Sequence, residues 1–131
     1  MKRMRVGTLS DRLARRLAGI LGCLGLLFGV FGAHVLRSFL ESHGTAEYWR
    51  TGVLYHLVQA VALLALSGWR PVPRFAFYLI LAGVTVFSGS LYALALTNLK
   101  WFGAITPVGG LGMLSGWLVL ALAKGPRKGL L

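Results

Sequence analysis

A histidine and a glutamine interrupt an otherwise apolar stretch of the chain, TGVLYHLVQAVALLALSG at residues 51–68. His56 and Gln59 are three residues apart, so they would share one face of a helix. Polar side chains inside a membrane span face the interior of a bundle or a water-filled cavity. If this stretch crosses a membrane, the pair therefore predicts a polar site inside the protein.

Two kinds of chemistry could use a histidine in this setting. His34 lies at a matching depth in another apolar run, so haem bound by two imidazoles is one interpretation. Two intramembrane histidines that hydrogen-bond to polar neighbours are the more common arrangement. Hydrolysis at Ser88 or Ser90 would need an acid to orient His56, but all three acidic residues lie outside the apolar runs. We therefore expect no enzyme, no metal site and no cofactor.

The composition favours a membrane protein. Hydrophobic residues make up 56% of the 131 residues and charged residues 13%, and the mean hydropathy is +0.73. A soluble domain carries about 25% charged residues. The net charge of +11 would suggest nucleic-acid binding in a soluble protein, but here the basic residues lie at the ends and between the apolar runs. We expect the lipid bilayer, and no nucleic acid, as partner.

Four apolar runs are long enough to cross a bilayer, which takes about 20 helical residues. In lipid, a helix satisfies its own backbone hydrogen bonds, whereas an isolated strand does not. The sequence therefore predicts an all-α fold, a four-helix transmembrane bundle with a membrane domain at 17–123. The expected spans are about 17–36, 46–68, 76–97 and 102–123, between a basic segment at 1–16 and a basic tail at 124–131.

The distribution of Lys and Arg predicts that both termini are cytoplasmic. Eleven of the 14 lie in the N-terminal segment, the loop between the second and third spans, and the C-terminal tail. Only Arg37, Arg50 and Lys100 lie on the other side. Positive residues are enriched in cytoplasmic loops. The longer connection at 37–50 is expected to extend a helix that ends at Gly44.

Glycines form one face of the first span and one face of the fourth. They are Gly22, Gly25, Gly29 and Gly32 in the first, and Gly109, Gly112 and Gly116 in the fourth. Small residues allow membrane helices to approach closely. Tight packing within the bundle and contact with a second copy or another membrane protein both remain open. His34 lies on a different side of its span from the glycines, so only one of the two can face the bundle.

Polar side chains from all four spans are expected at one depth, in the outer half of the membrane. This follows from a rise of about 1.5 Å per helical residue. The members of this layer are His34, His56, Gln59, Tyr92 and Thr106. Together they would form a ligand-binding site for a lipid-like or quinone-like molecule.

Two helix starts can be anticipated from local sequence. Thr45 after Gly44 is a favourable N-cap for the second span. Pro107 lacks a backbone donor and is best placed in a first turn, with Thr106 as the cap. The fourth helix would then begin at 107 and leave 102–105 as an irregular entry, either a simple start near the interface or a functional broken helix.

Four segments resemble the YgdD/YwdK-like family of small membrane proteins. They are FGAHVL at 31–36, YWRTGVLYHLVQAVALLAL at 48–66, FSGSLYALALT at 87–97 and ITPVGGLGMLSGW at 105–117. The resemblance spans nearly the whole chain after residue 17. It implies four transmembrane helices in the bacterial inner membrane and no established activity, hence no catalytic residues to transfer. The family's histidine in the second span falls where this chain has Gln59, so its role does not transfer to His56.

Two functions of different classes follow from these patterns. The first expectation is a structural or accessory subunit that docks through its glycine faces onto a larger membrane complex or onto its own copy. The alternative is a small-molecule, lipid or quinone binding or transport protein that uses the polar layer. Co-purifying proteins and lipids distinguish the two.

Overall fold

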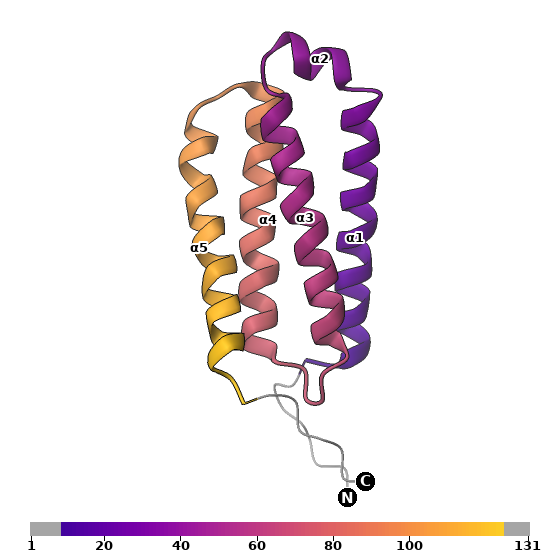
Figure 1. Ribbon diagram of the computed structural model, residues 1–131, viewed down its shortest axis with the longest axis vertical. Coiled ribbons are helices and arrows are strands. Elements are labelled where there is room, and N and C mark those ends of the chain that lie inside the picture. The colour runs from indigo at the N-terminus through magenta and orange to yellow at the C-terminus, as the bar shows by residue number, and fades with distance from the viewer. Residues whose placement is uncertain (1–8, 125–131) are drawn as a thin grey trace, which may run out of the picture.

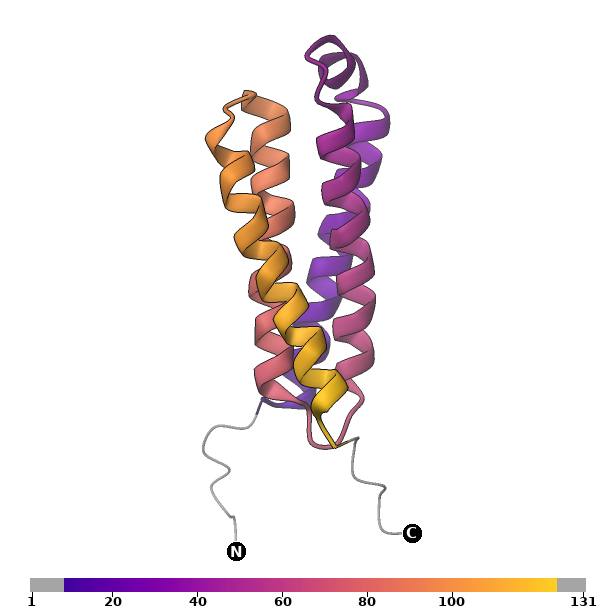
Figure 2. The same cartoon turned by 60° about the vertical axis from the view of Figure 1, so that its left-hand side comes forward.

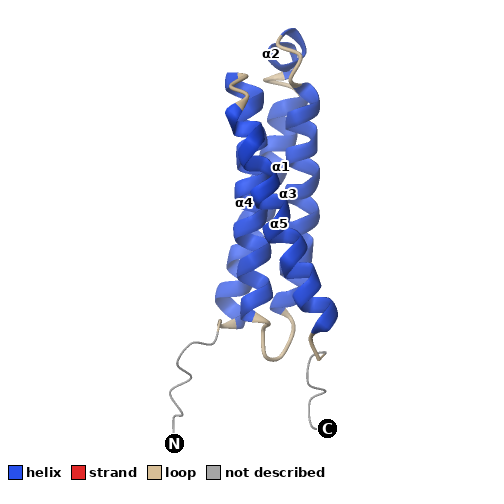
Figure 3. Ribbon diagram, turned by 90° about the vertical axis from the view of Figure 1, so that its left-hand side faces the viewer, coloured by secondary structure: helices blue, strands red, loops and turns tan. Residues whose placement is uncertain are grey.

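The computed structural model describes residues 9–124 and consists of four long helices and one short helix, without a strand in that range (Figures 1 and 3). The helices are α1 (Asp11–Ala33), α2 (Arg37–Ser42), α3 (Ala46–Ser67), α4 (Arg74–Thr97) and α5 (Trp101–Leu122). The four long helices contain 22 to 24 residues each and are apolar enough to cross a membrane. This confirms the predicted all-α, four-helix transmembrane fold.

The first helix differs from the expected first span at both ends. It begins at Asp11, within the basic segment, because Ser10 caps it by accepting a 3.1 Å hydrogen bond from the Leu13 nitrogen. It ends at Ala33, and His34 is the C-cap. The connection that follows contains a separate helix, α2, instead of an extension of α1.

The fifth helix is continuous from Trp101 to Leu122 and contains Pro107 in its interior. The expectation of a helix start at 107 is therefore wrong. Thr106 does not act as a cap: its hydroxyl donates to the Phe102 carbonyl at 3.2 Å and lies 2.6 Å from the Ser90 hydroxyl of α4.

The long helices pack in the order α1, α3, α4, α5, so that α3 and α4 are central (Figure 1). Half of the residues in the apolar stretch of α4 are buried in the bundle, compared with 11% in that of α1, so α1 is the more peripheral helix. The short helix α2 lies at one end of the bundle, and the start of α1 and the end of α5 lie at the opposite end (Figure 2).

Glycines bring α4 and α5 into direct backbone contact. A Cβ atom on Gly109 would overlap the Phe87 main-chain nitrogen and lie 2.7 Å from the Gly83 carbonyl oxygen. Gly112 and Gly116 extend this contact along α5, against α4. Close approach of this kind is how small residues stabilise helix pairs in membranes. The glycine face of α5 is thus covered within the chain.

Two hydroxyl groups join α3 to α4. Thr45, which is 1% exposed, donates from Oγ1 to the Ala95 carbonyl at 2.8 Å, and Ser88 donates from Oγ to the Gly52 carbonyl at 2.7 Å. Thr45 precedes α3 as expected, but its side chain makes no capping hydrogen bond. Its hydroxyl instead fixes the position of the helix start against α4.

Candidate functional site

The glycine face of α1 packs against α3. Gly22 faces Ala60, Gly25 faces Leu57 and His56, Gly29 faces Val53, and Gly32 faces Trp49. A Cβ on Gly25 would lie 2.7 Å from Leu57 Cδ2, and one on Gly32 would overlap the Trp49 ring. His34 follows α1 as its C-cap and is exposed. The glycines, and not His34, therefore face the bundle.

His56 connects three helices through both of its ring nitrogens. Nε2 lies 2.7 Å from the Leu21 carbonyl oxygen of α1, and Nδ1 lies 2.9 Å from the Tyr92 hydroxyl of α4. A carbonyl oxygen can only accept, so Nε2 carries the proton, and in the neutral ring Nδ1 accepts from Tyr92. His56 is 5% exposed. Both nitrogens are engaged in helix contacts, which leaves neither of them to coordinate haem iron or another metal.

Trp49 makes an equivalent contact two helical turns closer to α2. Its Nε1 donates to the Phe28 carbonyl of α1 at 2.8 Å. The donors Trp49 and His56 are seven residues apart on α3, and the acceptors Phe28 and Leu21 are seven apart on antiparallel α1. In each case a glycine four residues after the acceptor leaves room for the ring. The seven-residue spacing of Gly25 and Gly32 thus leaves room for both rings of α3 to hydrogen-bond to the backbone of α1.

The other predicted polar residues form separate pairs. Gln59 accepts through Oε1 from Trp117 Nε1 of α5 at 3.0 Å. Thr106 pairs with Ser90, as described above. Within residues 9–124, every buried side-chain nitrogen and oxygen has a hydrogen-bond partner. The structure therefore does not bring His34, His56, Gln59, Tyr92 and Thr106 together around one cavity.

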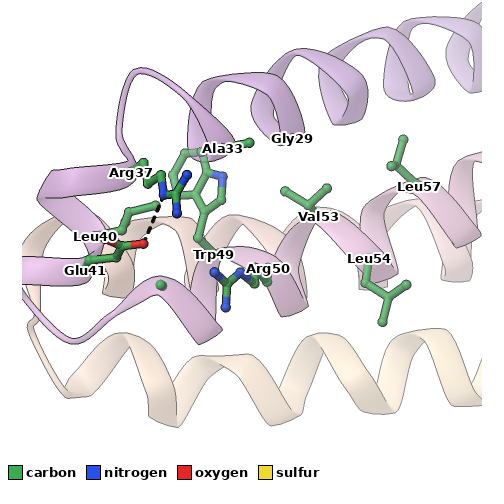
Figure 4. Close-up of a pocket in the computed structure, with 12 residues that line it drawn as sticks. Gly29, Ala33, Arg37, Leu40, Glu41, Trp49, Arg50, Val53, Leu54 and Leu57 are labelled. Atoms are coloured by element: carbon green, nitrogen blue, oxygen red, sulfur yellow. Dashed lines mark hydrogen bonds and ion pairs between the residues drawn. The ribbon is translucent and has the colours of Figure 1, made fainter.

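A groove of about 500 Å³ lies elsewhere, between α1, α2 and α3 (Figure 4). We call it the α2 groove. Its lining residues are Gly29, Gly32 and Ala33 of α1, Arg37, Leu40 and Glu41 of α2, and Ala46, Trp49, Arg50, Val53, Leu54 and Leu57 of α3. None of the five residues of the predicted polar layer is among them.

The α2 groove has a charged end and an apolar end. Figure 4 shows Arg37, Glu41 and Arg50 toward the α2 end, and Val53 and Leu57 further along α3. The sequence contained a signal for this site, because Arg37 and Glu41 lie in the connection at 37–50 and Arg50 lies at its end. These charges predicted which side of the membrane the connection occupies, but not that α2 would place them beside an apolar surface of α1 and α3.

Two exposed ion pairs surround the charged end of the groove. Arg37 Nε donates to Glu41 Oε1 at 3.2 Å, and Arg50 Nη1 donates to Glu47 Oε1 at 2.8 Å. Each pair lies within one helix and all four side chains are more than half exposed, so the pairs add little stability. Since a guanidinium has five N–H donors, each arginine retains donors that its own glutamate does not use.

The comparisons with known proteins concern nearly the whole chain. Residues 28–110 match the family model described as "Protein of unknown function (DUF423)". The UPF0382 membrane protein YwdK of Bacillus subtilis is 40% identical over 115 residues, covering 79% of this chain and 92% of its own. The UPF0382 inner membrane protein YgdD of Escherichia coli K12 is 33% identical over 130 residues, covering 92% of this chain and 97% of its own. No solved structure matches.

The names of the relatives agree with the fold of this chain. The relatives are named as membrane or inner membrane proteins, and this chain has four helices that are long and apolar enough to span a bilayer. The expected resemblance and the expected location are confirmed. The chain thus belongs to the DUF423 (UPF0382) family of multi-pass bacterial inner membrane proteins.

Proposed function

We propose that the protein is a non-enzymatic lipid-binding membrane protein that holds one amphiphilic molecule in the α2 groove. The observation that carries the proposal is the combination of an apolar wall and a charged end in one groove. Its volume of about 500 Å³ falls within the range of about 300–1,000 Å³ that is usual for ligand sites.

The dimensions of the groove suit an acyl chain with a polar headgroup. Arg50 and Leu57 are seven residues apart on α3, which corresponds to about 10 Å along the helix axis. An amphiphile with its headgroup at Arg50 would thus have its first methylene groups beside Val53 and Leu57. The charged end would lie at the membrane surface, where exposed ion pairs cost little.

An accessory role through the glycine faces has less support. The glycines of α1 face α3, and those of α5 face α4. Docking onto a larger complex or a second copy through these faces would require the bundle to open. A stoichiometric protein partner that co-purifies in mild detergent would nevertheless favour the accessory role over lipid binding.

The charge distribution supports an orientation with both termini in the cytoplasm and α2 outside. A cysteine in place of the exposed Ser42 should react with a membrane-impermeant maleimide in intact cells. A cysteine at the exposed Lys124 should react only after permeabilisation. Both variants need a Cys23→Ala background, because Cys23 is exposed. The reverse labelling pattern would invert the orientation and place the groove in the other leaflet.

Filling the groove should displace the bound molecule. Ala33 is exposed and lines the groove, so Ala33→Trp should reduce the lipid retained by the purified protein about tenfold while the helical content stays the same. Native mass spectrometry measures the retained lipid. Ala104→Trp is the matched control, since Ala104 is an exposed alanine of α5 outside the groove. Wild-type protein without a retained molecule would refute the proposed function.

A further inference from the structure

The proposed function can be carried one step further, because the charges at the α2 groove are arranged in pairs. The two ion pairs at this end contain two arginines and two glutamates, so their formal charges sum to zero. Three of them, Arg37, Glu41 and Arg50, line the groove itself. A headgroup that lies there therefore meets both signs of charge at once.

The arginines provide a site for phosphate. Arg37 comes from α2 and Arg50 from α3, and each uses one donor for its own glutamate. The remaining N–H groups of a guanidinium form a planar fork that matches phosphate oxygens. Because the two arginines belong to different helices at the same end of the groove, a phosphate diester between them would also hold α2 against α3.

The glutamate provides a site for an ammonium group. Glu41 accepts from Arg37 through Oε1, and an ionised carboxylate has further acceptor capacity on its other oxygen. A headgroup with phosphate alone would bring a net negative charge beside Glu41 and Glu47. A headgroup with a phosphate and an ammonium matches the groove in both signs, and only an ammonium that carries N–H groups can donate to Glu41.

We infer that the ligand of the α2 groove is a zwitterionic phospholipid with a primary ammonium, of the phosphatidylethanolamine type. Its phosphate lies between Arg37 and Arg50, its ammonium contacts Glu41, and one acyl chain lies along Val53 and Leu57. This assignment rests on the proposed function, since it specifies which amphiphile the groove selects.

The test is a competition between three phospholipids with identical acyl chains. Wild-type protein is equilibrated with equal amounts of phosphatidylethanolamine, phosphatidylglycerol and phosphatidylcholine, and native mass spectrometry counts the lipid retained by each chain. Phosphatidylethanolamine should be retained about fivefold over each of the other two. Glu41→Gln should remove this preference without abolishing lipid retention, whereas Arg37→Gln should reduce the retention of all three. Lys100→Gln is the control, because Lys100 lies outside the groove.

The outcomes separate this inference from the proposed function. Equal retention of the three lipids, or preference for phosphatidylglycerol or phosphatidylcholine, would overturn the headgroup assignment while leaving the groove as a lipid site. A preference for phosphatidylethanolamine that persists in Glu41→Gln would overturn the role of Glu41. No retention of any lipid by the wild-type protein would refute both.

Discussion

Gly109→Ala should lower the free energy of unfolding by about 3 kcal/mol, the upper end of the usual cost of overpacking. The added Cβ would overlap the Phe87 main-chain nitrogen and lie 2.7 Å from the Gly83 carbonyl oxygen. Since both are backbone atoms, no side-chain rotation can make room, and α4 and α5 must move apart. The measurement is unfolding in mixed detergent micelles with increasing SDS, followed by circular dichroism.

Gly89→Ala is the matched control for this prediction. Gly89 is likewise a helical glycine, in α4, but no heavy atom lies within 4 Å of a Cβ placed on it. Alanine is preferred over glycine in a helix by up to about 1 kcal/mol, so this variant should be as stable as the wild type or more stable. Equal stability of the Gly109→Ala and Gly89→Ala variants would show that α4 and α5 are not in backbone contact.

His56→Leu should destabilise the bundle by about 1–3 kcal/mol, the cost of leaving a buried hydrogen-bonding group unpaired. The substitution removes the contact to the Leu21 carbonyl and leaves the Tyr92 hydroxyl without its 2.9 Å partner. The same SDS unfolding assay measures the change. His34→Leu is the control and should have little effect, because His34 is exposed.

A double-mutant cycle with Tyr92→Phe isolates the hydrogen bond itself. Hydrogen bonds between membrane helices average about 0.6 kcal/mol and reach about 1.7 kcal/mol, so a coupling energy in this range is expected. Lipid retention should stay unchanged in His56→Leu, since His56 does not line the α2 groove. If the His56→Leu variant instead lost its lipid with no change in stability, His56 would contact the ligand, as expected for a ligand-binding polar layer.

The four membrane-spanning helices could be predicted from the sequence, but the short helix α2 could not, because the bilayer constrains only the segments that cross it. A span must be about 20 residues long, apolar and internally hydrogen-bonded, and each of these properties is local in the chain. Helix ends were less predictable. Ser10 starts α1 inside the basic segment, and α5 continues through Pro107.

The use of the glycine faces and of the polar side chains was decided only by tertiary structure. Residue spacing shows that Gly25 and Gly32 share a face, but not which helix covers it. Depth along each span likewise placed His56 and Gln59 in one layer, while their partners, Tyr92 and Trp117, depend on how the helices are rotated about their axes. How each helix is rotated about its axis, and which helix packs against it, are decided only when the bundle is assembled.

The α2 groove could not be predicted from the sequence because it is formed by three separate segments. Arg37 and Arg50 indicated only which side of the membrane their connection occupies. The break after α1 allows α2 to fold as a separate helix, and its charged side chains then lie beside apolar residues of α3. The sequence by itself therefore determined a membrane protein of four spans, since that follows from local hydropathy and hydrogen bonding. The site was decided by the tertiary structure, since a groove depends on the relative positions of distant residues.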